Sequence, residues 1–433
     1  MKKFLFALLT VSLFVMTSSM FAQENYVPKL RLDAPELAAL GSYTIGVRTL
    51  ELVNPAQLDI VNTAVGGDAP VYDRSLTVEV WYPAALAAGV EPGGEYSIVL
   101  RDGTSPATLT GLAVRDADPD AAAGPFPLVI MSHGYPGNRF LLAHLGENLA
   151  SKGYVVVSID HTDSTYSDQN VFGSTLYNRP IDQHFVLDTV TSLNADSTSF
   201  LSGLVDADNT AIIGYSMGGY GALISVGGAL TAASADFGYA TVNGLLARHQ
   251  ADNADYQAMM DPRIKAVVAF APWGNNTGFW DADGLAGITT PVMLIAGSKD
   301  DVAGYEIGAL DIFGKLVNSD RYLLTFINAN HNAGAPIPPP AEITTLDNFA
   351  HYSDAVWDNT RMNNISQHFI TAYLGIYLKG EDNGSYLDLV ENAADGVYSA
   401  NEDGTFKEDH TYWAGFQNRT ALGLALAHKP AGE

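Results

Sequence analysis

Short apolar runs alternate with longer stretches of mixed polarity along most of the chain. The apolar runs are rich in β-branched residues and have the length of strands. Several contain almost no polar side chain, as expected for strands buried on both faces of a sheet. The pattern predicts strands at Leu76–Trp81, Pro127–Ser132, Tyr154–Ile159, Thr210–Ile213, Lys265–Phe270, Pro291–Ile295 and Tyr322–Ile327.

Between these strands, the spacing of apolar residues changes to that of amphipathic helices. Helices are predicted at Phe140–Lys152, Ile181–Leu193, Met217–Val226, Tyr305–Val317 and Asn364–Leu378. Strands that alternate with helices favour an α/β fold with a mostly parallel central sheet flanked by helices on both faces.

The chain reads as one elaborated domain preceded by a targeting segment. Two lysines, an apolar run and a small residue at Ala22 are typical of a signal peptide over residues 1–22. We therefore expect export to the periplasm or beyond the cell, with residues 23–433 as a single α/β domain and no membrane span in the mature chain. The sequence leaves open whether an insertion at 229–262 is a cap or a passive surface loop, and a C-terminal extension covers 380–433.

Composition excludes several classes of function. The chain has 48 acidic and 22 basic residues, a formal charge of −26, so it should repel nucleic acid and anionic lipid. It has no cysteine, which excludes disulfides, thiolate metal sites and a cysteine nucleophile. The loop at 116–124 carries three aspartates but lacks the spacing and the glycine of a calcium loop. No metal or cofactor is expected.

The strongest chemical signal is Gly214-Tyr-Ser-Met-Gly218, which follows an apolar strand and precedes a helix rich in small residues. A serine on such a sharp turn has its hydroxyl exposed at the helix N-terminus, and glycine at the flanking positions lets the neighbouring backbones approach closely. Ser216 is the predicted nucleophile.

A serine hydroxyl needs a histidine as base and an acid that orients the histidine. Asp300 follows the strand at Pro291–Ile295, and His331 follows the strand at Tyr322–Ile327. Both therefore lie at carboxyl ends of strands, where open α/β sheets build their sites. The sequence predicts His331 as base and favours Asp300 as the acid, with the adjacent Asp301 as a competitor.

Two other histidines also follow strands but precede the serine, which is the wrong chain order for this type of triad. His133 is expected to support a loop, and His161 to line the edge of the site.

A tetrahedral intermediate also needs two backbone N–H donors for its oxyanion. The N–H of Met217, directly after the nucleophile, is one predicted donor. The second is predicted in the loop His133-Gly-Tyr-Pro-Gly137, at the N–H of Tyr135.

These motifs resemble the α/β-hydrolase superfamily, in particular the branch of platelet-activating-factor acetylhydrolase-like and dienelactone hydrolase-like proteins. The resemblance runs from Pro127 to Leu378, and its most specific pieces are Ser132-His-Gly-Tyr-Pro-Gly, Leu149-Ala-Ser-Lys-Gly-Tyr-Val-Val-Val-Ser-Ile-Asp-His and Gly214-Tyr-Ser-Met-Gly-Gly. One departure concerns the acid. In acetylhydrolases it follows the strand equivalent to Lys265–Phe270, where this chain has Ala-Pro-Trp273 and no carboxylate.

The same region is similar to cutinase-like polyester hydrolases, which share the Gly-x-Ser-Met-Gly-Gly elbow, an Ala-Pro-Trp and an aspartate placed like Asp300. By this resemblance Tyr135, Met217 and Trp273 form the subsite for the acyl group or aromatic ring. The missing disulfides, the insertion at 229–262 and the long tail depart from that family.

The expected function is hydrolysis of small-molecule or polymeric carboxylic esters through an acyl-enzyme. The alternatives are a polyester hydrolase, a serine peptidase with the same triad, and a non-catalytic binding protein with this fold. The acyl and alcohol specificity and the oligomeric state remain open.

Overall fold

The computed structural model describes residues 25–237 and 241–433. The predicted signal peptide at 1–22 lies outside the described residues. Within the described part, no helix combines the length and apolarity that crossing a membrane requires.

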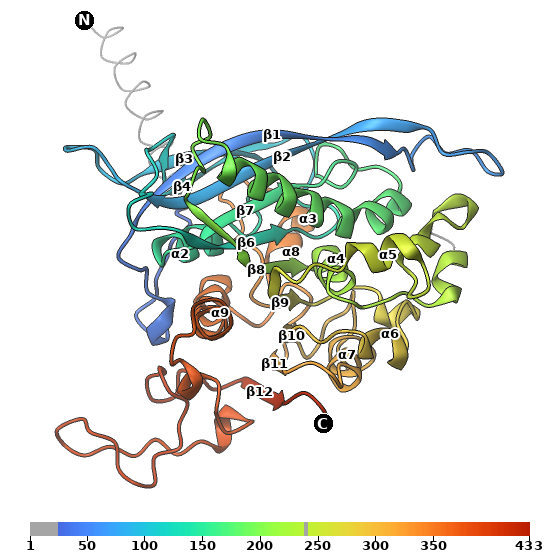
Figure 1. Ribbon diagram of the computed structural model, residues 1–433. Coiled ribbons are helices and arrows are strands. Elements are labelled where there is room, and N and C mark those ends of the chain that lie inside the picture. Colours follow the sequence, from blue (N-terminus) through green and yellow to red (C-terminus); the bar gives the residue numbers. More distant parts are fainter. Residues whose placement is uncertain (1–24, 238–240) are drawn as a thin grey trace, which may run out of the picture.

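A ten-stranded sheet forms the centre of the molecule, with strand order β12-β11-β10-β9-β8-β6-β7-β2-β1-β5 (Figure 1). The strands from β11 to β7 in this order are parallel, whereas β12 and β2 pair antiparallel with their inner neighbours. The strands of this sheet are β1 Thr44–Leu58, β2 Val71–Ala84, β5 Val114–Arg115, β6 Phe126–Ser132, β7 Val155–Asp160, β8 Val205–Tyr215, β9 Ile264–Phe270, β10 Val292–Gly297, β11 Arg321–Phe326 and β12 Leu424–Lys429. A separate hairpin pairs β3 Gly94–Val99 with β4 Pro106–Gly111.

Helices cover both faces of the sheet (Figure 1). The α-helices are α2 Ala143–Ser151, α3 Phe172–Ala195, α4 Met217–Ser225, α5 Ala254–Met259, α6 Ala282–Ala286, α7 Leu310–Lys315, α8 Leu346–Tyr352 and α9 Asn359–Leu374. Val129 and Met131 of β6 pack with α2 and α9 on one face. Leu128 and Ile130 point the other way and pack with α3 and α4. The alternation of buried residues along β6 therefore builds two apolar layers, one on each side of the sheet.

The predicted α/β class and mostly parallel sheet are confirmed. Each predicted strand lies within or overlaps an observed one, and the predicted helices correspond to α2, α3, α4, α7 and α9, with π-helical turns at Tyr305–Ala309 and Gly375–Lys379. Helix α3 begins at Phe172, well before the predicted start, and contains Pro180 in its interior.

The two additions to the predicted core have different positions. The insertion at 229–262 forms 3₁₀ turns at Ala232–Asp236 and Val242–His249 and then α5. Its residue Leu246 is fully buried, and the ring of its His249 bonds to the carbonyl of Tyr177 in α3. The extension at 380–433 ends in β12, which adds an antiparallel strand to the sheet edge at β11.

Candidate active site

Ser216 lies at the tip of the turn between β8 and α4. Its backbone has φ 53° and ψ −111°, a conformation that costs a residue with a side chain about 1–3 kcal/mol. The flanking glycines have a steric reason. A Cβ at Gly214 would collide with the backbone of Gly218, and a Cβ at Gly218 would collide with the carbonyl of Ser132. The structure therefore has the tight strand-to-helix turn that the motif predicts.

His331 and Asp300 meet at the carboxyl ends of neighbouring parallel strands, β11 and β10. His331 Nδ1 lies 3.0 Å from Asp300 Oδ1 and 2.9 Å from Oδ2. The carboxylate can only accept, so Nδ1 carries a proton, and the neutral form of the ring has its lone pair on Nε2.

The carboxylate of Asp300 is held as an anion. Burial alone would raise its pKa, but the hydrogen bond and charge of His331 and the N–H groups of Val302 and Ala303, each 2.9 Å from Oδ1, lower the pKa below its usual value. Asp301 is exposed, whereas Asp300 is 8% exposed. Of the two adjacent aspartates, only Asp300 contacts the imidazole in the described structure.

Ser216 and His331 line the same pocket, whose volume is about 290 Å³. Two groups of residues complete it. One is the loop after β6, and the other consists of residues that follow β10 and β11 and of α8; Tyr215, the last residue of β8, also lines it. The lining residues besides Ser216 and His331 are Gly134, Tyr135, Pro136, Tyr215, Asp301, Val302, Asn330, Asn332, Ala350 and His351. None of them belongs to the insertion at 229–262, so its role as a cap stays a prediction.

The predicted oxyanion donors occupy suitable elements. Met217 is the first residue of α4, so its N–H is one of the helix N-terminal donors that have no acceptor within the helix. Tyr135 lines the pocket beside Gly134, and its hydroxyl donates to the carbonyl of Asn170.

Trp273 lies close to the nucleophile through its backbone, because its N–H donates to the carbonyl of Ser216 at 3.3 Å. Its indole is half-buried and makes edge contacts with Phe172 and Phe279, with centroids 5.1 and 5.3 Å away. Neither Trp273 nor Met217 is among the residues that line the 290 Å³ pocket. Their place in an acyl subsite stays a prediction.

Several polar residues around the site were not found from the sequence. Asn332 accepts from the hydroxyl of Tyr215 at 2.9 Å and donates to the carbonyls of Ala350 and Ser353, so it ties the His331 loop to α8 and the residue that follows it. Arg179 and Asp182 are charged yet fully buried in α3. No local pattern in the sequence marks this pair.

The sequence analysis predicted that His161 lines the edge of the site, and this prediction is wrong. His161 is 1% exposed and lies behind the β6 loop, where its Nδ1 bonds to Asp182 at 2.9 Å and its Nε2 to the hydroxyl of Ser132 at 2.8 Å.

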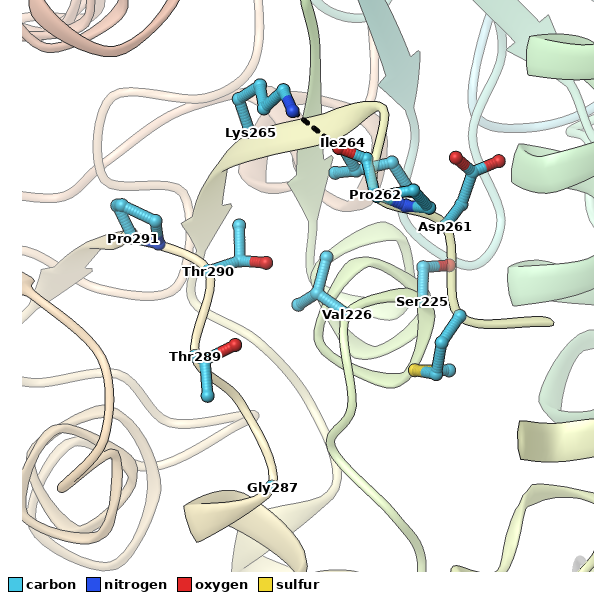
Figure 2. Close-up of a pocket in the computed structure, with 11 residues that line it drawn as sticks. Ser225, Val226, Asp261, Pro262, Ile264, Lys265, Gly287, Thr289, Thr290 and Pro291 are labelled. Carbon is cyan, nitrogen blue, oxygen red and sulfur yellow. Dashed lines mark hydrogen bonds between the residues drawn. The ribbon is translucent and has the colours of Figure 1, made fainter. Parts of the chain in front are cut away.

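A larger crevice of about 520 Å³ lies at the opposite ends of the strands, near the amino ends of β9 and β10 (Figure 2). Its charged groups are already bonded: Lys265 donates to the carbonyl of Pro262, and Asp261 pairs with Arg263. Ligands of open α/β sheets bind at the carboxyl ends of the strands, which is where the Ser216 pocket lies. The smaller pocket is therefore the candidate site.

The sheet, the strand-to-helix turn and the order serine, aspartate, histidine define an α/β-hydrolase fold. A family model described as PET hydrolase-like matches residues 115–240. The chain is 27% identical over 206 residues to cutinase est1 of Thermobifida alba, covering 47% of this chain and 53% of the relative. It is 26% identical over 209 residues to the bis(hydroxyethyl) terephthalate hydrolase of Streptomyces coelicolor, covering 48% and 51%.

Among solved structures, a ferulic acid esterase from Streptomyces cinnamoneus is similar, with a TM-score of 0.54 and 20% identity over 80% of this chain and 94% of that one. These comparisons confirm the predicted fold and the similarity to cutinase-like proteins. The chain spans about half the length of the curated relatives it matches. The resemblance to acetylhydrolase-like and dienelactone hydrolase-like proteins stays a prediction.

Proposed function

We propose that this chain hydrolyses carboxylic esters, with Ser216 as nucleophile, His331 as general base and Asp300 as the residue that orients His331. The observation that carries the proposal is the bidentate approach of Asp300 to Nδ1 of His331, which lines the same pocket as a serine held at positive φ. The similarity to cutinases and to a terephthalate ester hydrolase supports ester substrates in particular.

In the proposed mechanism, Ser216 Oγ attacks the acyl carbon while its proton passes to His331 Nε2. Asp300 keeps Nδ1 protonated and stabilises the imidazolium that forms. The N–H groups of Tyr135 and Met217 stabilise the oxyanion. His331 then protonates the departing alcohol, and water, activated by the same imidazole, releases the acid and restores Ser216.

A polyester substrate is the second candidate, and the PET hydrolase-like family model and the terephthalate-hydrolysing relative favour it. In this variant the proposed subsite of Tyr135, Met217 and Trp273 holds an aromatic acyl ring. We also propose export, on the evidence of the predicted signal peptide at 1–22.

A turnover screen tests the proposal. Purified protein and its Ser216→Ala variant are assayed with p-nitrophenyl esters of increasing acyl length, a benzoate ester, bis(hydroxyethyl) terephthalate and peptide p-nitroanilides. We expect ester turnover that Ser216→Ala lowers by several orders of magnitude at unchanged melting temperature. Preferential cleavage of the anilides would establish a peptidase instead, and no turnover of any substrate would leave a binding protein.

A further inference from the structure

The loop that carries Tyr135 rests on a buried arginine. Arg179 of α3 is fully buried, and its guanidinium donates to the carbonyls of His133 and, at 3.4 Å, of Gly134, as well as to the hydroxyl of Ser164. It forms no ion pair with a carboxylate in the described structure, because the nearby Asp182 is paired with Arg74 and His161. A buried cation is costly unless it makes strong hydrogen bonds, so its position against these carbonyls is strongly determined.

The Gly134 carbonyl and the Tyr135 N–H belong to one trans peptide, and in a trans peptide the two groups point in opposite directions. The carbonyl points to Arg179, which is buried under the loop. The N–H therefore points away from Arg179. Gly134 and Tyr135 line the pocket with Ser216, whereas Arg179 does not.

His133 holds the same peptide from a second direction. Its Nε2 accepts the backbone N–H of His161 at 3.2 Å, so Nδ1 carries the ring proton. This Nδ1–H donates to the carbonyl of Gly134 at 2.7 Å. The Gly134 oxygen thus receives two donors, which fix the plane of the peptide and polarise it, so that its N–H becomes a stronger donor.

A buried chain of hydrogen bonds fixes the neighbouring residues. The hydroxyl of Ser132 bonds to His161, His161 to Asp182, and Asp182 to the guanidinium of Arg74 at 2.8 and 2.9 Å. This is a second serine–histidine–aspartate chain, but Ser132, His161 and Asp182 are each at most 1% exposed and line none of the described pockets near the site. Its geometry serves to hold the end of β6 and His161, whose N–H sets the tautomer of His133.

We propose that Arg179 and His133 are positioning residues that hold the Gly134–Tyr135 peptide with its N–H directed at the oxyanion. This inference rests on the proposed ester hydrolysis. Neither side chain touches substrate; both act through the peptide. The consequence is that the oxyanion site is organised before substrate binds, and that its strength depends on a charge buried in α3.

The test compares oxygen esters with thionoesters, in which sulfur replaces the carbonyl oxygen. Sulfur is a weaker hydrogen-bond acceptor, so the ratio of the two rates reports how well the N–H donors are placed. We expect Arg179→Gln and His133→Ala to lower kcat on p-nitrophenyl acetate by about 10- to 100-fold, a part of the loss seen when an oxyanion donor is removed outright. KM should stay within about twofold, and the oxo-to-thiono rate ratio should fall.

Two controls separate positioning from general destabilisation. Arg321 is also fully buried and also donates to backbone carbonyls, among them those of Phe313 and Ser319. It is the first residue of β11 and therefore lies at the end of that strand opposite to His331. Arg321→Gln should lower the melting temperature and leave the rate ratio unchanged. His133→Asn, whose amide retains a donor near the place of Nδ1, should recover most of the activity that His133→Ala loses.

The outcomes are distinct from those that test the proposed function. Absence of ester turnover in the unmodified protein would refute the function itself. If the protein is active and folded Arg179→Gln keeps both its kcat and its rate ratio, the positioning role is wrong. If Arg179→Gln fails to fold, the comparison of His133→Ala with His133→Asn tests the proposal. Equal activity and an equal rate ratio in these two variants would overturn it.

Discussion

At the scale of single residues, the adjacent aspartates after β10 differ in ways that only the folded loop reveals. Asp300 accepts from His331 and from two backbone N–H groups, whereas Asp301 is exposed and lines the pocket without contacting His331. We therefore expect Asp300→Asn to lower kcat by about 10³- to 10⁴-fold, because the amide disturbs the tautomer of His331. Asp301→Asn should change kcat by less than about fivefold. Steady-state kinetics on one ester decides, and a larger loss in Asp301→Asn would transfer the role of acid to that residue.

The sequence predicted Ser216, Asp300 and His331 because each stands in a local pattern, an apolar strand followed closely by the reactive residue. Arg179 and Asp182 had no such pattern. They lie inside a long helix, and their partners come from β2 and from the loops after β6 and β7, so only tertiary packing brings the groups together. A buried charge whose partners are distant in sequence has no local signature.

At the scale of elements, most of the predicted strands were the nearly continuous apolar ones of the parallel part of the sheet. The strands that were missed are the two-residue β5 and four strands of mixed polarity, β1, β3, β4 and β12, in which at least one face or edge is exposed. In β1, for example, buried Val47 and Leu52 are separated by half-buried and exposed residues. Such a pattern is hard to distinguish from a loop without the neighbouring strand.

Strand β12 gives the prediction that belongs to this scale. Leu426 is 3% exposed, pairs with Leu324 of β11 and donates its N–H to the carbonyl of Glu391 at 2.8 Å. Leu426→Ala should reduce the free energy of unfolding by about 2–5 kcal/mol, the usual cost of a cavity in a core. The matched control is Leu422→Ala at a residue 46% exposed, which should cost less than about 0.5 kcal/mol. Urea denaturation measures both, and equal small losses would mean that β12 adds little to the core.

At the scale of the whole molecule, buried histidines should make the fold sensitive to acid. Burial lowers the pKa of His144 and His249 to about 4, and burial together with nearby cationic groups lowers that of His161, His351 and His368 to about 3. In the unfolded chain these groups titrate near 6.5, so below that pH the unfolded state binds more protons and is favoured. The free energy of unfolding is therefore not reduced by these histidines above about pH 6.5, and it falls as the pH falls toward 4.

We expect the free energy of unfolding to fall between pH 7.5 and 5.5 by roughly 1 kcal/mol for each such histidine. His249→Gln tests the cause, because glutamine can still donate to the carbonyl of Tyr177 but does not titrate. Its stability should depend less steeply on pH than that of the unmodified protein. Identical pH dependence in the two proteins would assign the acid sensitivity to other groups.

The most direct measurement of the central claim is to trap the acyl-enzyme. The protein is mixed with p-nitrophenyl acetate, quenched in acid within the first turnover and digested, and the peptide that contains Ser216 is examined by mass spectrometry. We predict one acetyl group on Ser216, a matching burst of p-nitrophenol, and neither signal in Ser216→Ala. Turnover without acetylation of Ser216, or acetylation that persists elsewhere in Ser216→Ala together with full activity, would contradict the account.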